Sequence, residues 1–158
     1  MSRFGIGYDA HRFDSSRPLI LGGVQITSAS GLGGHSDGDV LCHSLIDAIL
    51  GASALGDIGK HFPEEVVEYG SSSINLLKIT AKKLHEDNWF IENVDATIVT
   101  QTPRLSDYLL PIRKEISKAL AIDLNCVSGK ATTEDGLGYT GNKEGILVLS
   151  VASVEKKS

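Results

Sequence analysis

The chain has 158 residues, of which 41% are hydrophobic and 22% charged, values typical of one soluble globular domain. Its formal net charge of −5 gives no general attraction to nucleic acid or to an anionic membrane, so any phosphate chemistry must use local cations or metal ions. Two cysteines are too few for a disulfide framework, no apolar run approaches the roughly 18 residues of a membrane span, and strand-like sequence starts within five residues of Met1. We therefore expect a single cytoplasmic domain over residues 1–158, without a signal peptide.

The first quarter of the chain has strand patterns followed by a helix pattern. Residues 3–11 and 19–26 are predicted to be strands, with a bend or bulge at Gly22 and Gly23. Residues 28–34 contain three glycines and two serines and are predicted to be a flexible loop.

A helix is predicted around His43, with either Asp37 or Asp39 as its N-cap and either Gly51 or Gly56 at its end. Apolar residues recur there at helical spacing and should face the core, which leaves three polar side chains together on another face. The apolar set is Leu41, Leu45, Ala48, Ile49 and Ala52, and the polar set is Asp39, His43 and Asp47.

The rest of the chain continues to alternate between helices and strands. Residues 56–63 are a turn-rich connector, and a loop with four glycines is expected over residues 134–145. The interleaved order predicts an α/β (α+β) fold, a single domain with a mixed β-sheet and helices packed on one face. The predicted helices are 72–87 and 107–120, and the predicted strands are 94–100, 127–133 and 146–154.

Asp9, His11 and His43 form a candidate zinc site. Side chains alternate along a strand, so Asp9 and His11 should project to the same side, and His43 lies on the polar face of its helix. One carboxylate and two imidazoles suit Zn²⁺ at about 2.0–2.2 Å, and three protein ligands leave a fourth position open for a substrate. A lone histidine is more often an ordinary polar residue, but two ligands at strand spacing favour a metal site.

A serine hydrolase is the main alternative. The segment Gly34-His-Ser36-Asp-Gly38 matches the G-x-S-x-G nucleophile elbow. However, that fold has its catalytic histidine late in the chain, and no histidine follows His85. The segment before Gly34 also has the composition of a loop rather than of a strand.

Two further segments could handle phosphate. His35 and Ser36 lie just ahead of a helix, where backbone amides favour an anion, although Ser36 could equally be a cap. Residues 130–135 combine a lysine, two threonines and two carboxylates, which suit Mg²⁺ or Mn²⁺ on a diphosphate. A solvated loop with an incidental charge pair explains residues 130–135 equally well.

Taken together, the motifs resemble those of the 2-C-methyl-D-erythritol 2,4-cyclodiphosphate synthase family of the non-mevalonate isoprenoid pathway. The resemblance extends over almost the whole chain, and the combination is specific although no single motif is. The motifs are Gly7-Tyr-Asp-Ala-His11, His35-Ser-Asp-Gly-Asp39, His43, Gly56-Asp-Ile-Gly-Lys60 with Phe62-Pro63, Asn93-Val-Asp95, Lys130-Ala-Thr-Thr133 and Gly138-Tyr-Thr-Gly141.

The resemblance implies a lyase that cyclises 4-diphosphocytidyl-2-C-methyl-D-erythritol 2-phosphate and releases CMP. The 2-phosphate of the substrate attacks the β-phosphorus, so the protein supplies positioning and charge stabilisation rather than a nucleophile. The resemblance further implies one Zn²⁺ per subunit, Mg²⁺ or Mn²⁺ with the bound substrate, and a homotrimer with active sites at the subunit interfaces.

The family's functional positions can be carried over to residues of this sequence. Zinc would be bound by Asp9, His11 and His43, the second metal by Asp135, and the transition state would be stabilised by His35 and Thr133. This chain has Glu134-Asp135 where the family usually has Thr-Glu, so Glu134 is an alternative ligand of the second metal. Within the substrate, the phosphates would contact His35 and Ser36, the methylerythritol part residues 57–59 and 62–64, and the cytidine residues 100–106 with Ala131 and Thr132. The whole set of expected substrate contacts is Asp9, Ala10, His11, His35, Ser36, Asp57, Ile58, Gly59, Phe62, Pro63, Glu64, Thr100, Gln101, Thr102, Pro103, Arg104, Leu105, Ser106, Ala131, Thr132, Thr133, Glu134, Asp135, Tyr139 and Asn142.

Overall fold

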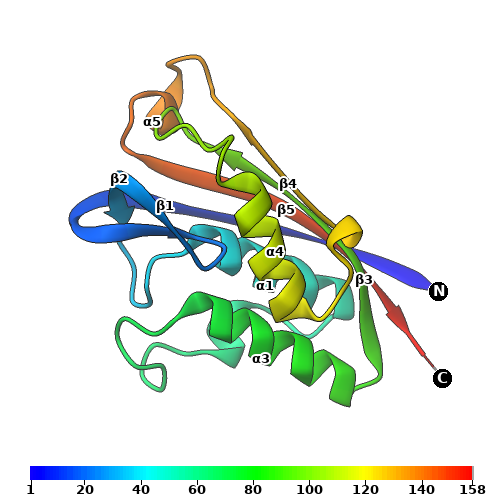
Figure 1. Ribbon diagram of the computed structural model, residues 1–158. Helices are drawn as coiled ribbons and strands as arrows, with labels where there is room; N and C mark the ends of the chain where they lie inside the picture. Colours follow the sequence, from blue (N-terminus) through cyan, green and yellow to red (C-terminus); the bar gives the residue numbers. More distant parts are fainter. Residues whose placement is uncertain (158) are drawn as a thin grey trace.

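A five-stranded mixed sheet with strand order β2-β1-β5-β3-β4 forms one layer of the fold (Figure 1). The computed structural model describes residues 1–157, with the backbone only at residue 28. β3 and β4 are parallel, and the other neighbouring pairs are antiparallel. The strands are β1 (Ser2–Leu21), β2 (Val24–Leu32), β3 (Trp89–Val99), β4 (Val127–Thr132) and β5 (Gly145–Lys156).

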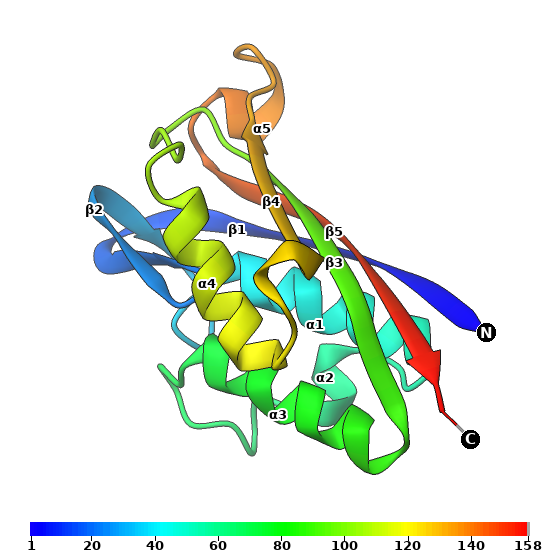
Figure 2. The same cartoon turned by 45° about the vertical axis from the view of Figure 1, so that its right-hand side comes forward.

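The three long helices cover one face of this sheet, as predicted (Figures 1 and 2). α1 packs against β1 and β5, α3 packs on α1 and β3, and α4 packs on α3 and β4. The hydrophobic core lies between the helices and the sheet. The helices are α1 (Val40–Ser53), α3 (Ser73–Glu86) and α4 (Leu109–Leu120), with the short α2 (Ile58–His61), α5 (Gly138–Gly141) and the 3-10 turn η1 (Leu124–Cys126) between the larger elements.

Two glycines of β1 allow α1 to approach the sheet very closely. A Cβ atom at Gly7 would lie 1.8 Å from the carbonyl oxygen of Ser44, and one at Gly5 would lie 2.1 Å from that of Ala48. Only a residue without a side chain fits such a contact between backbones. This close packing holds His43 of α1 beside the β1 residues that follow Gly7.

The hairpin of β1 and β2 differs from the prediction. β1 is continuous to Leu21, so the predicted strand 19–26 is a hairpin whose tight turn is Gly22-Gly23, with φ of +57° and +76°. The predicted flexible loop 28–34 is wrong up to residue 32, because β2 extends to Leu32 and only Gly33 and Gly34 follow it as a loop. Gly31 lies there because a Cβ atom would come within 2.3 Å of the carbonyl oxygen of Pro18, and not because the segment needs flexibility.

The boundaries of α1 are partly as predicted. Asp39 is its N-cap and accepts a hydrogen bond from the Cys42 amide. Asp39 is nevertheless fully buried, where it also accepts from the amides of Gly22 and Gly23, so it does not share an open face with His43. The helix ends at Ala54 in the left-handed conformation, so neither predicted glycine ends it.

Two loops contain short helices that the sequence analysis did not predict. The connector 56–63 contains α2, which is capped by the side chain of Asp57, and the loop 134–145 contains α5. Both helices are only four residues long, too short to show a periodic pattern. β3 starts at Trp89 and is therefore longer than the predicted strand 94–100.

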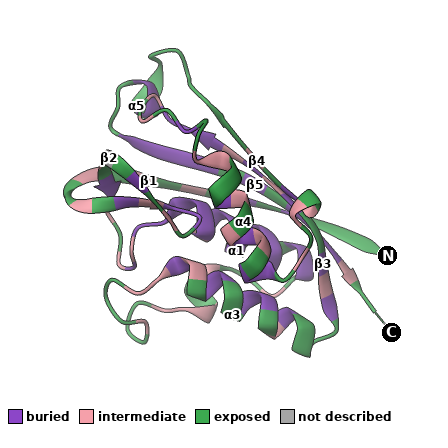
Figure 3. Ribbon diagram, in the orientation of Figure 1, coloured by how far each residue is buried: buried purple, intermediate pink, exposed green. Residues whose placement is uncertain are grey.

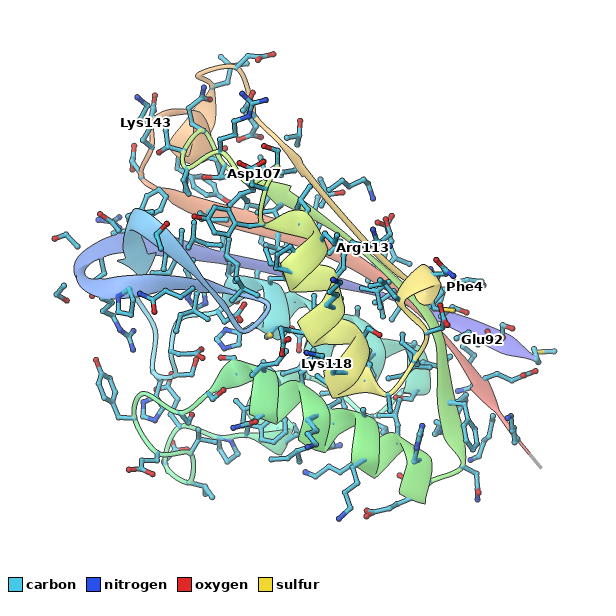
Figure 4. All side chains as sticks on the ribbon, viewed as in Figure 1. Phe4, Glu92, Asp107, Arg113, Lys118 and Lys143 are labelled. Carbon is cyan, nitrogen blue, oxygen red and sulfur yellow. The ribbon has the colours of Figure 1, made fainter. Side chains whose placement is uncertain are left out.

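The face of the sheet opposite the helices carries exposed apolar side chains. Phe4 and Ile6 are 72% and 75% exposed, and Tyr8, Leu149 and Val151 are also exposed. The N-terminal end of β1 is drawn in the exposed colour in Figure 3, and Figure 4 places Phe4 and Glu92 near the end of the sheet that carries both termini. In the part of the chain that the structure describes, no helix is long and apolar enough to cross a membrane.

Candidate active site

Asp9, His11 and His43 converge at the point where β1 meets α1. Asp9 Oδ2 lies 2.9 Å from His11 Nε2 and 3.2 Å from His43 Nδ1, and the two nitrogens are 3.4 Å apart. Ligands about 2.1 Å from a tetrahedral centre are about 3.4 Å apart, so the three atoms are close to the spacing that a bound cation would impose. The residues therefore fit a divalent metal ion by donor type and by arrangement, as their spacing in the sequence predicted.

Asp9 and His11 each stabilise the charged form of the other. Burial opposes ionisation of Asp9, but hydrogen bonds and charge interactions with His11 and His43 outweigh it and lower the pKa of Asp9. Burial also opposes protonation of His11, but the contact with Asp9 outweighs it and raises the pKa of His11. Asp9 is thus a carboxylate at neutral pH, the form that binds a cation.

The cluster lies in an open cleft of about 490 Å³ between β1, α1 and α2. Asp47, one turn after His43 on α1, also lines the cleft and accepts a hydrogen bond of 2.7 Å from the Ile58 amide, which fixes the start of α2. Burial is the main cause of a raised pKa at Asp47, and the neighbouring Asp57 and Asp9 charges add to it. Nine of the predicted substrate residues line this cleft, namely Asp9, Ala10, His11, His35, Ser36, Ile58, Gly59, Phe62 and Glu64.

The segment that precedes α1 is held by Arg17, a residue that the sequence analysis missed. Its guanidinium donates hydrogen bonds to the carbonyl oxygens of Leu32 and Gly34 at 3.3 and 2.7 Å, and also to that of Ser36. The same group lies 5.5 Å from the ring centre of Tyr69. Arg17 therefore fixes the backbone on both sides of His35, whose Nε2 lies 2.6 Å from the Val67 carbonyl oxygen.

Ser36, His43 and Asp9 have the connectivity of a Ser–His–Asp triad. Ser36 Oγ lies 2.9 Å from His43 Nε2, and His43 Nδ1 faces Asp9. However, Ser36 is only 5% exposed, and its hydroxyl also lies 3.0 Å from that of Ser73. A hydroxyl that is enclosed in this way is poorly placed to attack a substrate in the cleft, which argues against the hydrolase alternative.

A second cleft of about 410 Å³ lies at the start of α4 and the ends of β3 and β4, and none of the residues that the structure describes lines both clefts. It gathers most of the positions predicted to bind cytidine, together with Leu109. Thr102 belongs to the same segment but does not line the cleft. The predicted residues that line it are Thr100, Gln101, Pro103, Arg104, Leu105, Ser106, Ala131, Thr132 and Thr133.

The remaining predicted site residues lie outside the two clefts. Asp57 caps α2, and Pro63 follows this helix. Glu134 accepts a hydrogen bond from Thr140, whereas Asp135 accepts one of 3.2 Å from Thr133, which lines the second cleft.

Tyr139 and Asn142 belong to α5 and its C-cap. Tyr139 lines a smaller cleft of about 200 Å³ together with Ala10, His11 and Arg12, so it lies close to the strand that carries two of the metal ligands. The Tyr139 hydroxyl lies 3.3 Å from that of Tyr8 on the open face of the sheet. Partial burial and this contact raise the pKa of Tyr139 to about 12. Within one chain, then, the structure does not bring Thr133, Asp135 or Tyr139 into the cleft of the metal cluster.

The fold and the cluster define a single-domain mixed α/β protein with a candidate divalent-metal site in an open cleft. The chain belongs to the YgbB family, which its sequence matches over residues 2–155.

Relatives named 2-C-methyl-D-erythritol 2,4-cyclodiphosphate synthase include proteins of Lachnospira eligens and Clostridium perfringens. The first is 52% identical over 157 residues, which cover 99% of this chain and 86% of the relative, and the second is 50% identical over 155 residues, which cover 98% and 99%. These similarities confirm the family that the motifs indicated.

Solved structures of the same fold include the bifunctional IspDF of Campylobacter jejuni, with a TM-score of 0.95 and 41% identity, covering 100% of this chain and 43% of that one. A CDP complex of IspF from Plasmodium falciparum has a TM-score of 0.86 and 35% identity, covering 99% of this chain and 97% of that one.

Proposed function

We propose that this chain forms 2-C-methyl-D-erythritol 2,4-cyclodiphosphate, the reaction for which its relatives are named. It is an enzyme of isoprenoid precursor biosynthesis, a lyase acting on phosphorus–oxygen bonds. The observation that carries this proposal is the convergence of Asp9, His11 and His43 in an open cleft, in a chain about half identical to such synthases over nearly its full length.

The substrate is 4-diphosphocytidyl-2-C-methyl-D-erythritol 2-phosphate. An oxygen of its 2-phosphate forms a bond to the β-phosphorus, the bond from that phosphorus to the bridging oxygen breaks, and this oxygen leaves with CMP. Because the nucleophile belongs to the substrate, the protein has to align the two phosphates and stabilise their charge. When bound by the cluster, a divalent ion would polarise the β-phosphate.

Each half of the site has its own task in this reaction. His35 and the backbone amide of Ser36, in the segment held by Arg17, bind phosphate beside the cluster, while α2 and the residues after it bind the methylerythritol part. The second cleft binds the cytidine, and Thr133 stabilises the charge that develops at the phosphates.

Zn²⁺ is the metal of the cluster because one carboxylate and two imidazoles are ligands that it prefers. Mg²⁺ or Mn²⁺ is the second metal, which a carboxylate of the chain would hold and which would neutralise charge on the diphosphate. Asp135 is the better candidate for that ligand, because its hydrogen-bond partner Thr133 lines the cytidine cleft, whereas Glu134 is bonded to Thr140 in α5.

The active enzyme is a homotrimer in which the metal cleft of one chain faces the cytidine cleft of its neighbour. Two features support this assembly: within the described part of the chain the two clefts share no lining residue, and the open sheet face exposes Phe4, Ile6 and Tyr8. An exposed apolar face of this kind is typical of a surface that another chain covers. A cytoplasmic location fits a small-molecule enzyme with two unpaired cysteines.

Phosphorus NMR of the purified protein with substrate, Zn²⁺ and Mg²⁺ tests the reaction. We expect signals of a cyclic diphosphate to appear together with CMP and to be abolished by a chelator. A hydrolase would instead release CMP together with an open-chain bisphosphate, and a chelator would not stop it. Either that product or unchanged substrate would refute the proposed function.

Complementation between subunits tests the composite site. His43→Ala and Thr133→Ala chains should each be inactive alone, because each variant damages one half of every site. In mixed trimers assembled at random by co-expression, about a quarter of the sites combine two intact halves, so about a quarter of the activity should return. Mixed trimers verified by native mass spectrometry that show no activity would refute the shared site.

A further inference from the structure

His43 faces two different sets of partners with its two ring nitrogens. Nδ1 points toward Asp9 and His11, while Nε2 lies 2.9 Å from the hydroxyls of both Ser36 and Ser73. A nitrogen that binds a metal ion must carry a free lone pair, so the ring proton has to be on Nε2. The partner of Nε2 therefore decides whether His43 presents a lone pair or a proton to the metal.

Ser73 is the partner whose hydrogen-bond direction is fixed. Its hydroxyl donates to Asp37 Oδ1 at 2.5 Å, and because a carboxylate only accepts, this hydroxyl can only accept from His43. Ser73 is fully buried, so no solvent competes for this position. The Ser36 hydroxyl has no carboxylate partner among the described residues and can turn either way.

Asp37 is in turn held in place by backbone groups. Its Oδ2 accepts from the Ser73 amide at 3.0 Å, and its Oδ1 accepts from the Asp39 amide at 3.2 Å. Asp37 thus caps α3 from a distance, while the local N-cap residue Ser72 makes no side-chain hydrogen bond to the helix. The start of α3 is thereby tied to the segment that leads into α1 and His43.

We propose that Asp37 and Ser73 are positioning residues for metal binding, which hold the His43 ring with its proton on Nε2 and its Nδ1 lone pair toward the cation. This inference rests on the metal site of the proposed function. Histidine ligands of metals commonly donate their second N–H to a carboxylate or a carbonyl, and loss of such a partner typically lowers metal affinity 10- to 100-fold. Here the Ser73 hydroxyl is inserted between the imidazole and the carboxylate.

The test is the Zn²⁺ affinity of purified metal-free protein, measured by competition with a chromogenic chelator. Ser73→Ala should weaken binding about 10- to 100-fold. Ser72→Ala is the matched control, since it removes a neighbouring hydroxyl that makes no cap bond, and its affinity should stay within about twofold of wild type. Unchanged affinity of a folded Ser73→Ala variant would overturn the inference.

Asp37→Ala provides a second variant. It removes the carboxylate to which the Ser73 hydroxyl donates, so this hydroxyl is free to donate to His43 Nε2 instead of accepting from it. We expect a loss of affinity similar to that of Ser73→Ala, and little additional loss when the two are combined, because both act through the same hydrogen bond. Wild-type affinity in Asp37→Ala would overturn the inference even if Ser73→Ala did not fold.

The absorption spectrum of Co²⁺ in the site separates ligand geometry from general stability. The spectrum should change in both variants under conditions where circular dichroism shows them fully folded, and stay unchanged in Ser72→Ala. Wild-type protein that binds neither Zn²⁺ nor Co²⁺ would refute the metal site itself, a result distinct from equal binding by wild type and variants.

Discussion

Gly7→Ala should separate α1 from β1 and thereby disrupt the metal cluster. The new Cβ atom would lie 1.8 Å from the Ser44 carbonyl oxygen, whereas carbon and oxygen atoms need about 3.2 Å, so the two backbones must move apart by about 1.4 Å. Overpacking a core by side-chain atoms typically costs about 1–3 kcal/mol, and a clash with backbone belongs at or above the top of that range. His43 lies next to Ser44, so the displacement reaches a metal ligand directly.

Gly51→Ala, in the same helix, is the matched control. A Cβ atom at Gly51 would meet nothing within 4 Å, so this variant should gain about 0.5–1 kcal/mol from better helix propensity. Urea unfolding with and without Zn²⁺, together with the chelator competition, measures both effects. Gly7→Ala should lose both stability and Zn²⁺ affinity, and wild-type values for both quantities would refute the reasoning about close packing.

Three further perturbations test other parts of the site. Arg17→Ala removes hydrogen bonds to three carbonyl oxygens in a partly exposed setting. We expect this to weaken substrate binding by about 2 kcal/mol, seen as a raised KM with unchanged Zn²⁺ content. Loss of Zn²⁺ would contradict this role. Asp135→Ala should raise the Mg²⁺ concentration needed for half-maximal activity while the Zn²⁺ content stays constant, whereas Glu134→Ala should leave the Mg²⁺ requirement unchanged. The opposite result would assign the second metal to Glu134. Asp47→Asn keeps an acceptor for the Ile58 amide but removes a carboxylate whose pKa is raised, mainly by burial. A raised carboxyl pKa means that ionisation weakens the fold, so the variant should have a higher Tm than wild type at pH 7. This gain in Tm should vanish below about pH 3.5, where the carboxyl is protonated in both the folded and the unfolded state. A gain in Tm that does not depend on pH would contradict this explanation.

Local periodicity predicted the parts of the site that depend on one element at a time. Alternation along β1 placed Asp9 and His11 on the same side, and helical spacing turned His43 away from the apolar stripe of α1. The family resemblance predicted the residues of the second cleft, which come from segments near positions 100 and 131 that no local pattern connects.

Contacts between distant segments were not predictable from the sequence. Arg17 reaches the carbonyl oxygens around His35 because β1 is irregular between Asp14 and Leu19, and nothing in its composition shows that path. The composition of residues 28–34 predicts a loop, but glycine permits flexibility and close packing equally well, and only the neighbouring strand decides between the two. The role of Ser73 was not predictable either, since its partners His43 and Asp37 lie 30 and 36 residues away in the chain.

The metal cluster draws its ligands from a strand and a helix, and Asp9 and His43 lie 34 positions apart in the chain. A cation bound there would act as a removable cross-link, which closes this part of the chain in the folded state and has no comparable site in the unfolded one. By mass action, free Zn²⁺ at 100 times its dissociation constant would add about 2.7 kcal/mol to the free energy of unfolding. Metal supply would then govern how long the chain survives in the cell as well as how fast it turns over substrate, so starvation for zinc would deplete the protein itself.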